Sequence, residues 1–289
     1  MSTVYLNGEF VPKEKAFVSV DDRGFLFADG IYEVTPAYRG ALFRIERHLE
    51  RMQRGLDALR IGFDPAVLAE VHPRLLAENG LEDEPTAIVY VQVTRGVAPR
   101  AHAFPTTPVR PTVYAFAKEF KRPARDVWEQ GFLATTVTDR RWGRADLKTI
   151  GLLPNCLALQ AAIEDGSTDA LLVRDGIAIE GAHSNFFAVL DGVVTTHPKT
   201  NQILHGITRE YVLELARDLG LPVDERPIQI EEMASADEAF FTGTTTEVRP
   251  TVRIDGRPVG EGRVGPVARR LMDAFVAGVE RETAAAGRA

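Results

Sequence analysis

One lysine lies in a sequence setting that is unusual for this residue type. Of the six lysines among the 289 residues, five lie among charges, prolines or turn residues, whereas Lys148 enters an apolar stretch that continues through Cys156 and Leu159. Burial disfavours the ammonium form of a lysine, and Schiff-base formation requires the unprotonated amine. A lysine can also extend its charge out of an apolar surface into water. The pattern by itself leaves both interpretations open.

Two further segments have the composition of anion-binding sites. In residues 205–212, Thr208 is expected to be the N-cap of a helix. The first backbone amides and the positive end of the dipole of that helix would face an anion. In residues 239–247, an apolar strand leads through Gly243 into three consecutive threonines, whose hydroxyls and amides suit phosphate oxygens. Each segment also has a purely structural interpretation, as a well-capped helix and as a threonine-rich turn.

An acidic residue completes the set of candidate functional residues. Glu180 follows an apolar strand and precedes Gly181, which indicates a partly buried carboxylate. A buried carboxylate needs a compensating partner. The protonated nitrogen of a pyridine ring and an arginine of this chain both meet that need.

The composition is that of a globular protein, with 45% hydrophobic and 26% charged residues. A net charge of −7 argues against non-specific binding to nucleic acid or to anionic membranes. The single cysteine, Cys156, excludes an intramolecular disulfide, and its side chain is expected to be buried as a small hydrophobic group. Because the sequence begins without a basic, apolar leader and has no 18-residue apolar run, we expect a cytoplasmic protein.

The pattern of apolar residues predicts an α+β fold. The first half is expected to contain an opening hairpin around Asn7-Gly8, and a loop at 97–110 that projects from a sheet. The predicted strands are 4–6, 9–11, 31–38, 41–44, 86–96, 111–117, 132–137, 170–173, 177–180, 185–190 and 193–196. The predicted helices are 45–59, 65–77, 153–164, 208–219 and 264–281.

The chain is expected to form two domains. A basic, proline-bearing stretch at 118–125 marks a change in composition between two segments of strand character. We therefore place the domain boundary there, with one domain at 1–119, a linker at 120–126 and a second domain at 127–289.

The sequence resembles the fold type IV family of pyridoxal 5'-phosphate (PLP) enzymes over nearly its whole length. The resemblance implies a small N-terminal α/β domain, a larger PLP-binding domain with a barrel-like sheet, PLP between the domains and a homodimer that completes each site. It rests on six motifs in the family's order, which are residues 27–33, His48 to Arg51, Lys148 with Asn155, Glu180-Gly181 with 184–187, 204–209, and Thr244-Thr245.

The resemblance also implies a role for each matching residue. Lys148 would form the Schiff base with PLP and move the proton between the substrate Cα and the cofactor C4′. Glu180 would pair with the pyridine nitrogen and keep it protonated, so that the ring can accept electrons. The phosphate would be held by Arg51, Ile207, Thr208, Thr244 and Thr245. No metal ion is implied.

The loop at residues 94–105 resembles the Arg-x-His loop of D-amino-acid aminotransferases. It implies that Arg100 and His102 reach across from the neighbouring subunit and hold the substrate α-carboxylate together with Tyr32. A carboxylate held there would present the α-hydrogen of a D-amino acid to Lys148. The implied activity is amino transfer between D-amino acids and 2-oxo acids.

Two residues leave the choice of substrate open. Pro36 and His183 depart from the D-enzyme pattern near the expected substrate pocket, and Arg141 is close in sequence to Lys148, where it could organise a cofactor oxygen or Glu33. The alternatives are an (R)-amine transaminase, a branched-chain L-amino-acid aminotransferase and an aminodeoxychorismate lyase of the same fold. A non-catalytic PLP-binding protein is disfavoured because storage of PLP needs no proton shuttle.

Overall fold

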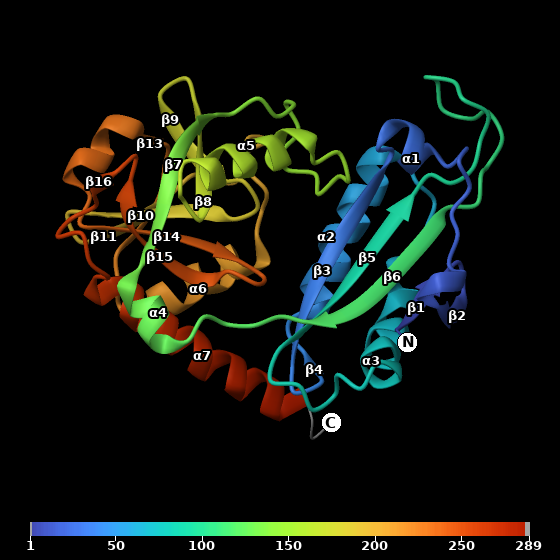
Figure 1. The fold of residues 1–289 in the computed structure, drawn as a ribbon, viewed down its shortest axis with the longest axis horizontal. Coiled ribbons are helices and arrows are strands. Elements are labelled where there is room, and N and C mark those ends of the chain that lie inside the picture. Colours follow the sequence, from blue (N-terminus) through green and yellow to red (C-terminus); the bar gives the residue numbers. More distant parts are fainter. Residues whose placement is uncertain (1, 287–289) are drawn as a thin grey trace. The chain divides into compact units, whose positions relative to one another are not determined.

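The computed structural model describes residues 2–286 and divides into two compact units (Figure 1). The first unit comprises the chain up to Lys121, the segment Leu147–Gly151 and the described residues from Val279 onward. The second comprises Arg122–Asp146 and Leu152–Gly278. Compactness of this kind does not test the domain boundaries predicted at 119 and 127, which remain a prediction.

The first unit contains a six-stranded sheet in the order β2-β1-β6-β5-β3-β4. The Asn7-Gly8 hairpin is confirmed, because β1 pairs with β2 and both turn residues have positive φ. Its strands are β1 (Thr3–Leu6), β2 (Glu9–Pro12), β3 (Gly30–Tyr38), β4 (Ala41–Leu42), β5 (Ala87–Thr94) and β6 (Thr112–Glu119). Its helices are α1 (Arg23–Phe27), α2 (Ile45–Leu59) and α3 (Leu68–Glu78), with 3-10 turns at Lys13–Lys15 and Pro65–Val67.

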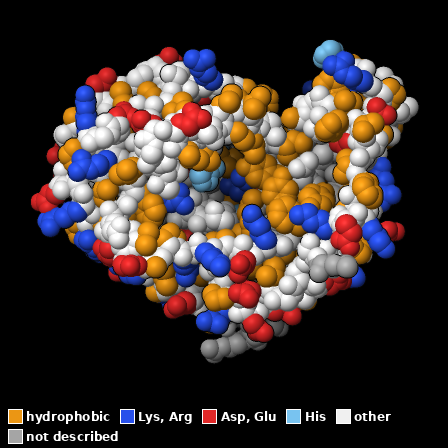
Figure 2. Space-filling model, in the orientation of Figure 1, with side chains coloured by type: hydrophobic (Ala, Val, Ile, Leu, Met, Phe, Trp, Pro, Cys, Tyr) orange, Lys and Arg blue, Asp and Glu red, His pale blue; other side chains and the backbone are white. Residues whose placement is uncertain are grey.

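The two faces of this sheet have different partners. Alternate residues of β5, such as Val89 and Val91, are fully buried in the core with Met52 and Leu56 of α2. On the opposite face, aromatic rings stack across the strands, with centroid distances of 5.6 Å for Tyr32–Tyr90 and 5.0 Å for Tyr90–Phe116. Tyr114, on the same strand as Phe116, lies tilted against it at 5.8 Å. Figure 2 shows hydrophobic side chains gathered over β5 and β6 on this open face.

The second unit is built around a closed barrel. Six strands form the ring β10-β14-β15-β7-β8-β9, and the ring closes where β9 pairs with β10 at Glu180 and Asn185. The ring strands are β7 (Phe132–Thr138), β8 (Asp169–Arg174), β9 (Ile177–Gly181), β10 (Asn185–Leu190), β14 (Glu238–Gly243) and β15 (Glu247–Ile254). The expected barrel-like sheet is therefore confirmed.

The remaining elements of this unit extend or cover the barrel. The outer strands are β11 (Val193–Thr196), β12 (Val223–Glu225), β13 (Ile228–Gln229) and β16 (Arg257–Pro258). The helices are α4 (Arg125–Gln130), α5 (Leu153–Glu164), α6 (Ile207–Asp218) and a 3-10 helix at Ile230–Ser235. The last helix, α7 (Pro266–Ala286), begins in this unit and ends in the first. Phe186 and Phe241 of neighbouring strands fill the core, with ring centroids 5.1 Å apart.

Two sequence-based expectations are wrong. Cys156 is exposed rather than buried, because α5 packs through Ala158 and Ala162 and turns the side that carries Cys156 and Leu157 outward. Since α5 is apolar on several sides, its sequence pattern did not indicate which side is buried. Thr208 is not an N-cap, because α6 begins one residue earlier than expected and Gly206 occupies the cap position.

Within residues 2–286, no helix is long and apolar enough to cross a membrane.

Candidate active site

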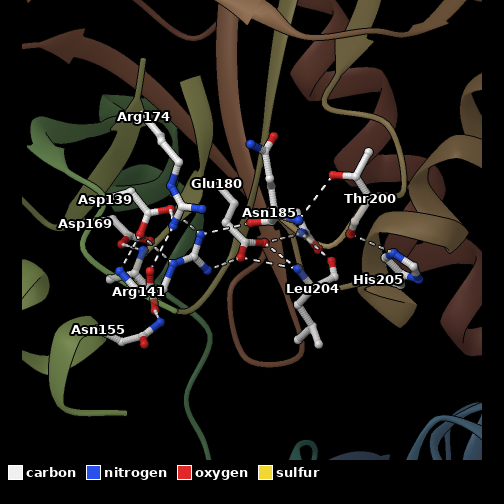
Figure 3. A network of polar contacts seen from close by, with 12 residues as sticks. Asp139, Arg141, Asn155, Asp169, Arg174, Glu180, Asn185, Thr200, Leu204 and His205 are labelled. Carbon is white, nitrogen blue, oxygen red and sulfur yellow. Dashed lines mark hydrogen bonds and ion pairs between the residues drawn. The ribbon is translucent and has the colours of Figure 1, made fainter. Parts of the chain in front are cut away.

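Glu180 lies at the closure of the barrel, where its buried carboxylate is surrounded by donors (Figure 3). Asn185 Nδ2 donates to Oε2 at 2.8 Å, and the backbone amide of Leu204 lies 3.1 Å and 3.2 Å from the two oxygens. Arg141 forms an ion pair with the same carboxylate from the other side. Of the two partners that the sequence left open, the arginine is therefore present in this chain and is Arg141.

The electrostatics of this group are set by burial and by two flanking charges. Burial raises the pKa of Glu180 to about 7, and Asp139 adds to the rise, while Arg141 and the Leu204 amide oppose it. Arg141 remains protonated. Burial by itself would lower its pKa, but Asp139, at 2.9 Å, and Glu180 outweigh that effect and raise the pKa above its ordinary value. Arg174 also pairs with Asp139 at 2.9 Å. The result is a carboxyl group that a nearby cation could readily ionise.

The start of α6 forms a narrow cradle next to Asn185. A Cβ atom at Gly206 would lie 2.0 Å from Asn185 Oδ1, so a glycine is required there. The first amides of a helix have no partner within the helix, and because α6 starts at Ile207 they include those of Ile207 and Thr208. Arg209, also in the first turn, is fully buried and donates from one terminal nitrogen to the His197 carbonyl at 2.7 Å.

Several buried polar atoms near these elements have no partner in the described part of the chain. They are Nε and one terminal nitrogen of Arg209, Thr242 Oγ1 and Thr246 Oγ1. Thr242 and Thr246 flank the predicted pair Thr244-Thr245, and α6 packs against β14, which ends at Gly243. Buried donors of this kind without a partner are uncommon and indicate a site for an additional acceptor. Thr246 is the last of the three consecutive threonines noted in the sequence, whereas Thr242 and Arg209 were missed, although both lie within or beside the matched motifs.

A second buried carboxylate shapes the turn between β9 and β10. Asp169 accepts hydrogen bonds from Ser184 Oγ at 2.7 Å and from the Ala182 amide at 3.2 Å. These bonds fix the residues on either side of His183, whose own side chain is exposed, with Nδ1 3.9 Å from Asp169. Asp169 was missed from sequence, where the signal was an acid at the start of an otherwise apolar strand.

Lys148 is brought to the edge of the first sheet. Its carbonyl accepts a hydrogen bond from the Tyr32 amide at 3.0 Å, and Ile150 donates to Gly30 at 3.1 Å, so residues 147–151 follow the start of β3. The half-buried Lys148 side chain places Nζ 4.1 Å from the centroid of the Tyr32 ring. Two residues that lie far apart in the sequence therefore meet here.

Arg51 forms a buried, bidentate ion pair that the sequence did not reveal. Its guanidinium donates to the two carboxylate oxygens of Glu33 at 2.6 Å and 2.8 Å, and His48 Nδ1 lies 2.9 Å from the same carboxylate. Burial would raise the pKa of Glu33, but Arg51 and His48 hold it well below its usual range. Burial lowers the pKa of His48, against the opposing effect of Glu33. The predicted contact of Arg51 with a phosphate stays a prediction.

Arg100 and His102 are exposed on the loop between β5 and β6. The Arg100 guanidinium carbon lies 5.3 Å from the centroid of the Phe27 ring, and the His102 ring lies 5.6 Å from it. Figure 2 shows basic and histidine side chains at the tip of this loop, at the upper right. Among the residues whose side chains the structure describes, no carboxylate pairs with either residue.

Comparison with known proteins shows similarity over almost the whole chain. The family described as Amino-transferase class IV matches residues 30–254. A D-alanine aminotransferase of Staphylococcus haemolyticus is 42% identical over 277 residues, or 95% of this chain and 97% of that protein. A D-alanine aminotransferase of Bacillus licheniformis is 36% identical over 282 residues, which are 97% of this chain and 98% of that protein. The structure of a T.th. branched-chain amino acid aminotransferase with pyridoxamine 5'-phosphate has a TM-score of 0.87 at 30% identity and covers 96% of this chain and 94% of that one.

We predict that the cofactor-free protein loses stability as Glu180 ionises. The pKa of Glu180 is about 7 in the folded state, against the ordinary value of 4.5. A raised carboxyl pKa stabilises the fold at pH below the unfolded value, and that stabilisation is lost as pH rises through 7. Urea unfolding should show that the free energy of unfolding of the wild type falls between pH 5 and pH 8, by on the order of a few kcal/mol more than that of Glu180→Gln. This magnitude follows from about 1.4 kcal/mol per pKa unit. Parallel pH profiles for the two proteins would contradict the prediction.

Proposed function

We propose that this chain, which belongs to the class IV amino-transferase family, transfers amino groups between D-amino acids and 2-oxo acids. It is a PLP-dependent transaminase. The observation that carries the D-amino-acid proposal is the pair Arg100 and His102 on one exposed loop, each without an anionic partner in the described chain. The chain is also 42% identical to a protein described as a D-alanine aminotransferase over nearly its full length.

The residues of the second unit fit PLP. Glu180 is a buried carboxyl group that a pyridinium nitrogen would help to ionise, and Gly206 leaves room where any side chain would collide with Asn185. The partnerless atoms of Thr242, Thr246 and Arg209 are donors that suit an anionic group. We assign the pyridine nitrogen to Glu180, and the phosphate to the amides of Ile207 and Thr208 with Thr244, Thr245 and Arg51.

Each assigned residue has a distinct task in the reaction. When bound, PLP accepts electrons from the substrate Cα as its proton leaves. Lys148 would hold the cofactor covalently until the substrate amine takes its place, and its released amine would then move the proton at Cα. Tyr32 lies against this amine and limits where it can point. Glu180 keeps the pyridine nitrogen protonated. Arg141 holds Glu180 in place and is itself held by Asp139.

Arg100, His102 and Tyr32 would bind the substrate carboxylate. A guanidinium offers paired donors that match a carboxylate, and the imidazole and the phenol add further donors. We propose that Arg100 and His102 serve the site of a second copy of this chain in a homodimer. Large apolar side chains that are exposed in the first unit support an association of this kind, namely Phe17 (81% exposed), Val20 (72%), Phe25 (74%) and Phe104 (47%).

The substrates are amino acids and 2-oxo acids, and the preferred side chain depends on residues that depart from the D-enzyme pattern. His183 is exposed beside Asp169, and Pro36 lies within β3, downstream of Tyr32. The branched-chain neighbour is 30% identical, against 42% for the D-alanine aminotransferase, which favours the D-amino-acid activity. We further propose a cytoplasmic location, supported by a sequence with one cysteine.

We predict that Lys148→Ala loses both the covalent attachment of PLP and transamination. Borohydride reduction followed by peptide mapping should place the phosphopyridoxyl group on Lys148 in the wild type and on no residue in the variant. Lys199→Ala is the matched control, because Lys199 pairs with Glu210 at 3.3 Å on the surface and should label as the wild type does. A reduced adduct at the same peptide in Lys148→Ala would refute the assignment.

We predict that Gly206→Ala weakens PLP binding by about 10-fold or more, because a Cβ atom 2.0 Å from Asn185 Oδ1 must shift the start of α6 or the Glu180 partner. Gly143→Ala is the control, since nothing lies within 4 Å of its added Cβ. Titration of the cofactor-free proteins with PLP measures both. Equal dissociation constants for the two variants would show that the cradle is not the phosphate site.

We predict that Arg100→Ala reduces kcat/KM for a D-amino acid by about 10- to 150-fold, since the loss of one charge-assisted partner costs about 1.5–3 kcal/mol. Activity toward (R)-1-phenylethylamine, which has no carboxylate, should stay unchanged or rise. Arg110→Ala removes another arginine at the end of the same loop and is expected to change neither. A wild type that transaminates L-leucine faster than any D-amino acid would instead support the branched-chain alternative.

A further inference from the structure

One buried guanidinium attaches the part of the loop that carries Arg100 and His102 to the body of the first unit. Arg23, the first residue of α1, is 2% exposed. One of its terminal nitrogens donates to the carbonyl of Ala101 at 2.6 Å and lies 3.4 Å from the carbonyl of Ala103. These carbonyls belong to the residues on either side of His102, and Ala101 directly follows Arg100. A single side chain therefore holds the backbone at both proposed recognition residues.

Asp29 fixes the position of that guanidinium. Its Oδ2 accepts from Arg23 Nε and from Arg95 Nε, each at 2.7 Å. Arg95 also donates to the carbonyls of Leu59 and Arg60 at the end of α2, at 2.7 Å and 3.0 Å. Burial would raise the pKa of Asp29, but the two arginines lower it, so the carboxylate stays charged. The loop is thereby connected through Asp29 to the end of α2.

Aromatic rings add a second set of contacts to the loop. The centroid of the Phe27 ring lies 4.7 Å from the guanidinium carbon of Arg23 and 5.3 Å from that of Arg100. It lies 5.6 Å from the centroid of the His102 ring. The Phe104 ring lies 3.7 Å from the guanidinium carbon of Arg95. A long exposed loop is ordinarily mobile, and ordering it on binding costs affinity. These contacts order the loop in the absence of any substrate.

We propose that Arg23 is a positioning residue for substrate-carboxylate recognition, which it serves by holding Arg100 and His102 in a preformed arrangement. This inference rests on the proposed function of those two residues. Other residues fulfil the structural needs of the segment: Asp22 accepts from the Gly24 amide at 2.7 Å and caps α1, and Arg95 still neutralises Asp29 when Arg23 is removed. Arg23 is thus free to be replaced without exposing an unpaired buried charge.

A double-mutant cycle in the holoenzyme tests the proposal, with Arg23→Met and Arg100→Ala made singly and together. Arg23→Met should raise KM for D-alanine by about 5- to 30-fold, because the loop must then be ordered on binding. Its kcat, its PLP spectrum and its activity toward (R)-1-phenylethylamine should remain close to those of the wild type. In the Arg100→Ala background, the same substitution should raise KM by less than about threefold.

Three measurements separate the possible outcomes. The proposal would be overturned if Arg23→Met raised KM for D-alanine by the same factor in the wild-type and the Arg100→Ala backgrounds, or if it lowered activity toward the amine in parallel. Either result would indicate a general structural role. Arg23→Lys, which keeps one donor and the charge, should restore part of the wild-type KM, and it carries the same comparison if Arg23→Met does not fold. Amide hydrogen exchange should accelerate in residues 98–104 of Arg23→Met while β5 stays protected, and unchanged exchange would overturn the proposal.

The failure of the proposed function has a different signature. If Arg100→Ala leaves KM for D-alanine unchanged, the carboxylate assignment itself is wrong, and the inference about recognition falls with it. If Arg100→Ala raises KM but Arg23→Met does not, only the inference about Arg23 is overturned.

Discussion

The buried carboxylate of Glu180 constrains how the barrel of the second unit can close. It lies where the barrel closes, and the same residue that pairs with it in the strand register, Asn185, also donates to its side chain. Its other donors come from Leu204 and Arg141, which are distant in sequence. Because a buried carboxylate without donors is costly, these segments must meet at one point for the unit to fold. The contacts that close the barrel therefore also fix the position of Glu180, the proposed partner of the pyridine nitrogen.

The same physical arrangement recurs at several places in the described part of the chain. Buried arginine and carboxylate groups pair in Arg51–Glu33, in Arg141–Glu180 and in the cluster of Arg23, Asp29 and Arg95. Removing one member of the Arg51–Glu33 or Arg141–Glu180 pair leaves a buried charge without that partner, whereas Asp29 keeps one arginine when the other is removed. Each pair lies directly beside residues with a proposed role, which are Lys148 and Tyr32 near the first sheet, the start of α6, and the loop of Arg100. The protein positions its functional residues with buried charge rather than with apolar packing alone.

Much of the secondary structure could be predicted because its signals are local. The Asn7-Gly8 turn and the apolar periodicity of residues 45–59 depend only on neighbouring residues, and both elements form where expected. The ends of α6 and the orientation of α5 could not be predicted equally well. Gly206, not Thr208, caps α6. Cys156 is exposed because α5 packs through Ala158 and Ala162.

The sequence by itself determined which residue types are available and in what order, and hence the family resemblance, the α+β class and the set of candidate residues. The tertiary structure alone decided their partners. Nothing near Arg51 in sequence indicates that it binds Glu33, and nothing near Ala101 indicates that its carbonyl meets Arg23. Likewise, Lys148 meets Tyr32 only because residues 147–151 return to the edge of β3. Local patterns reflect backbone preference and burial, whereas a buried charge selects its partner through long-range contacts that exist only in the folded chain.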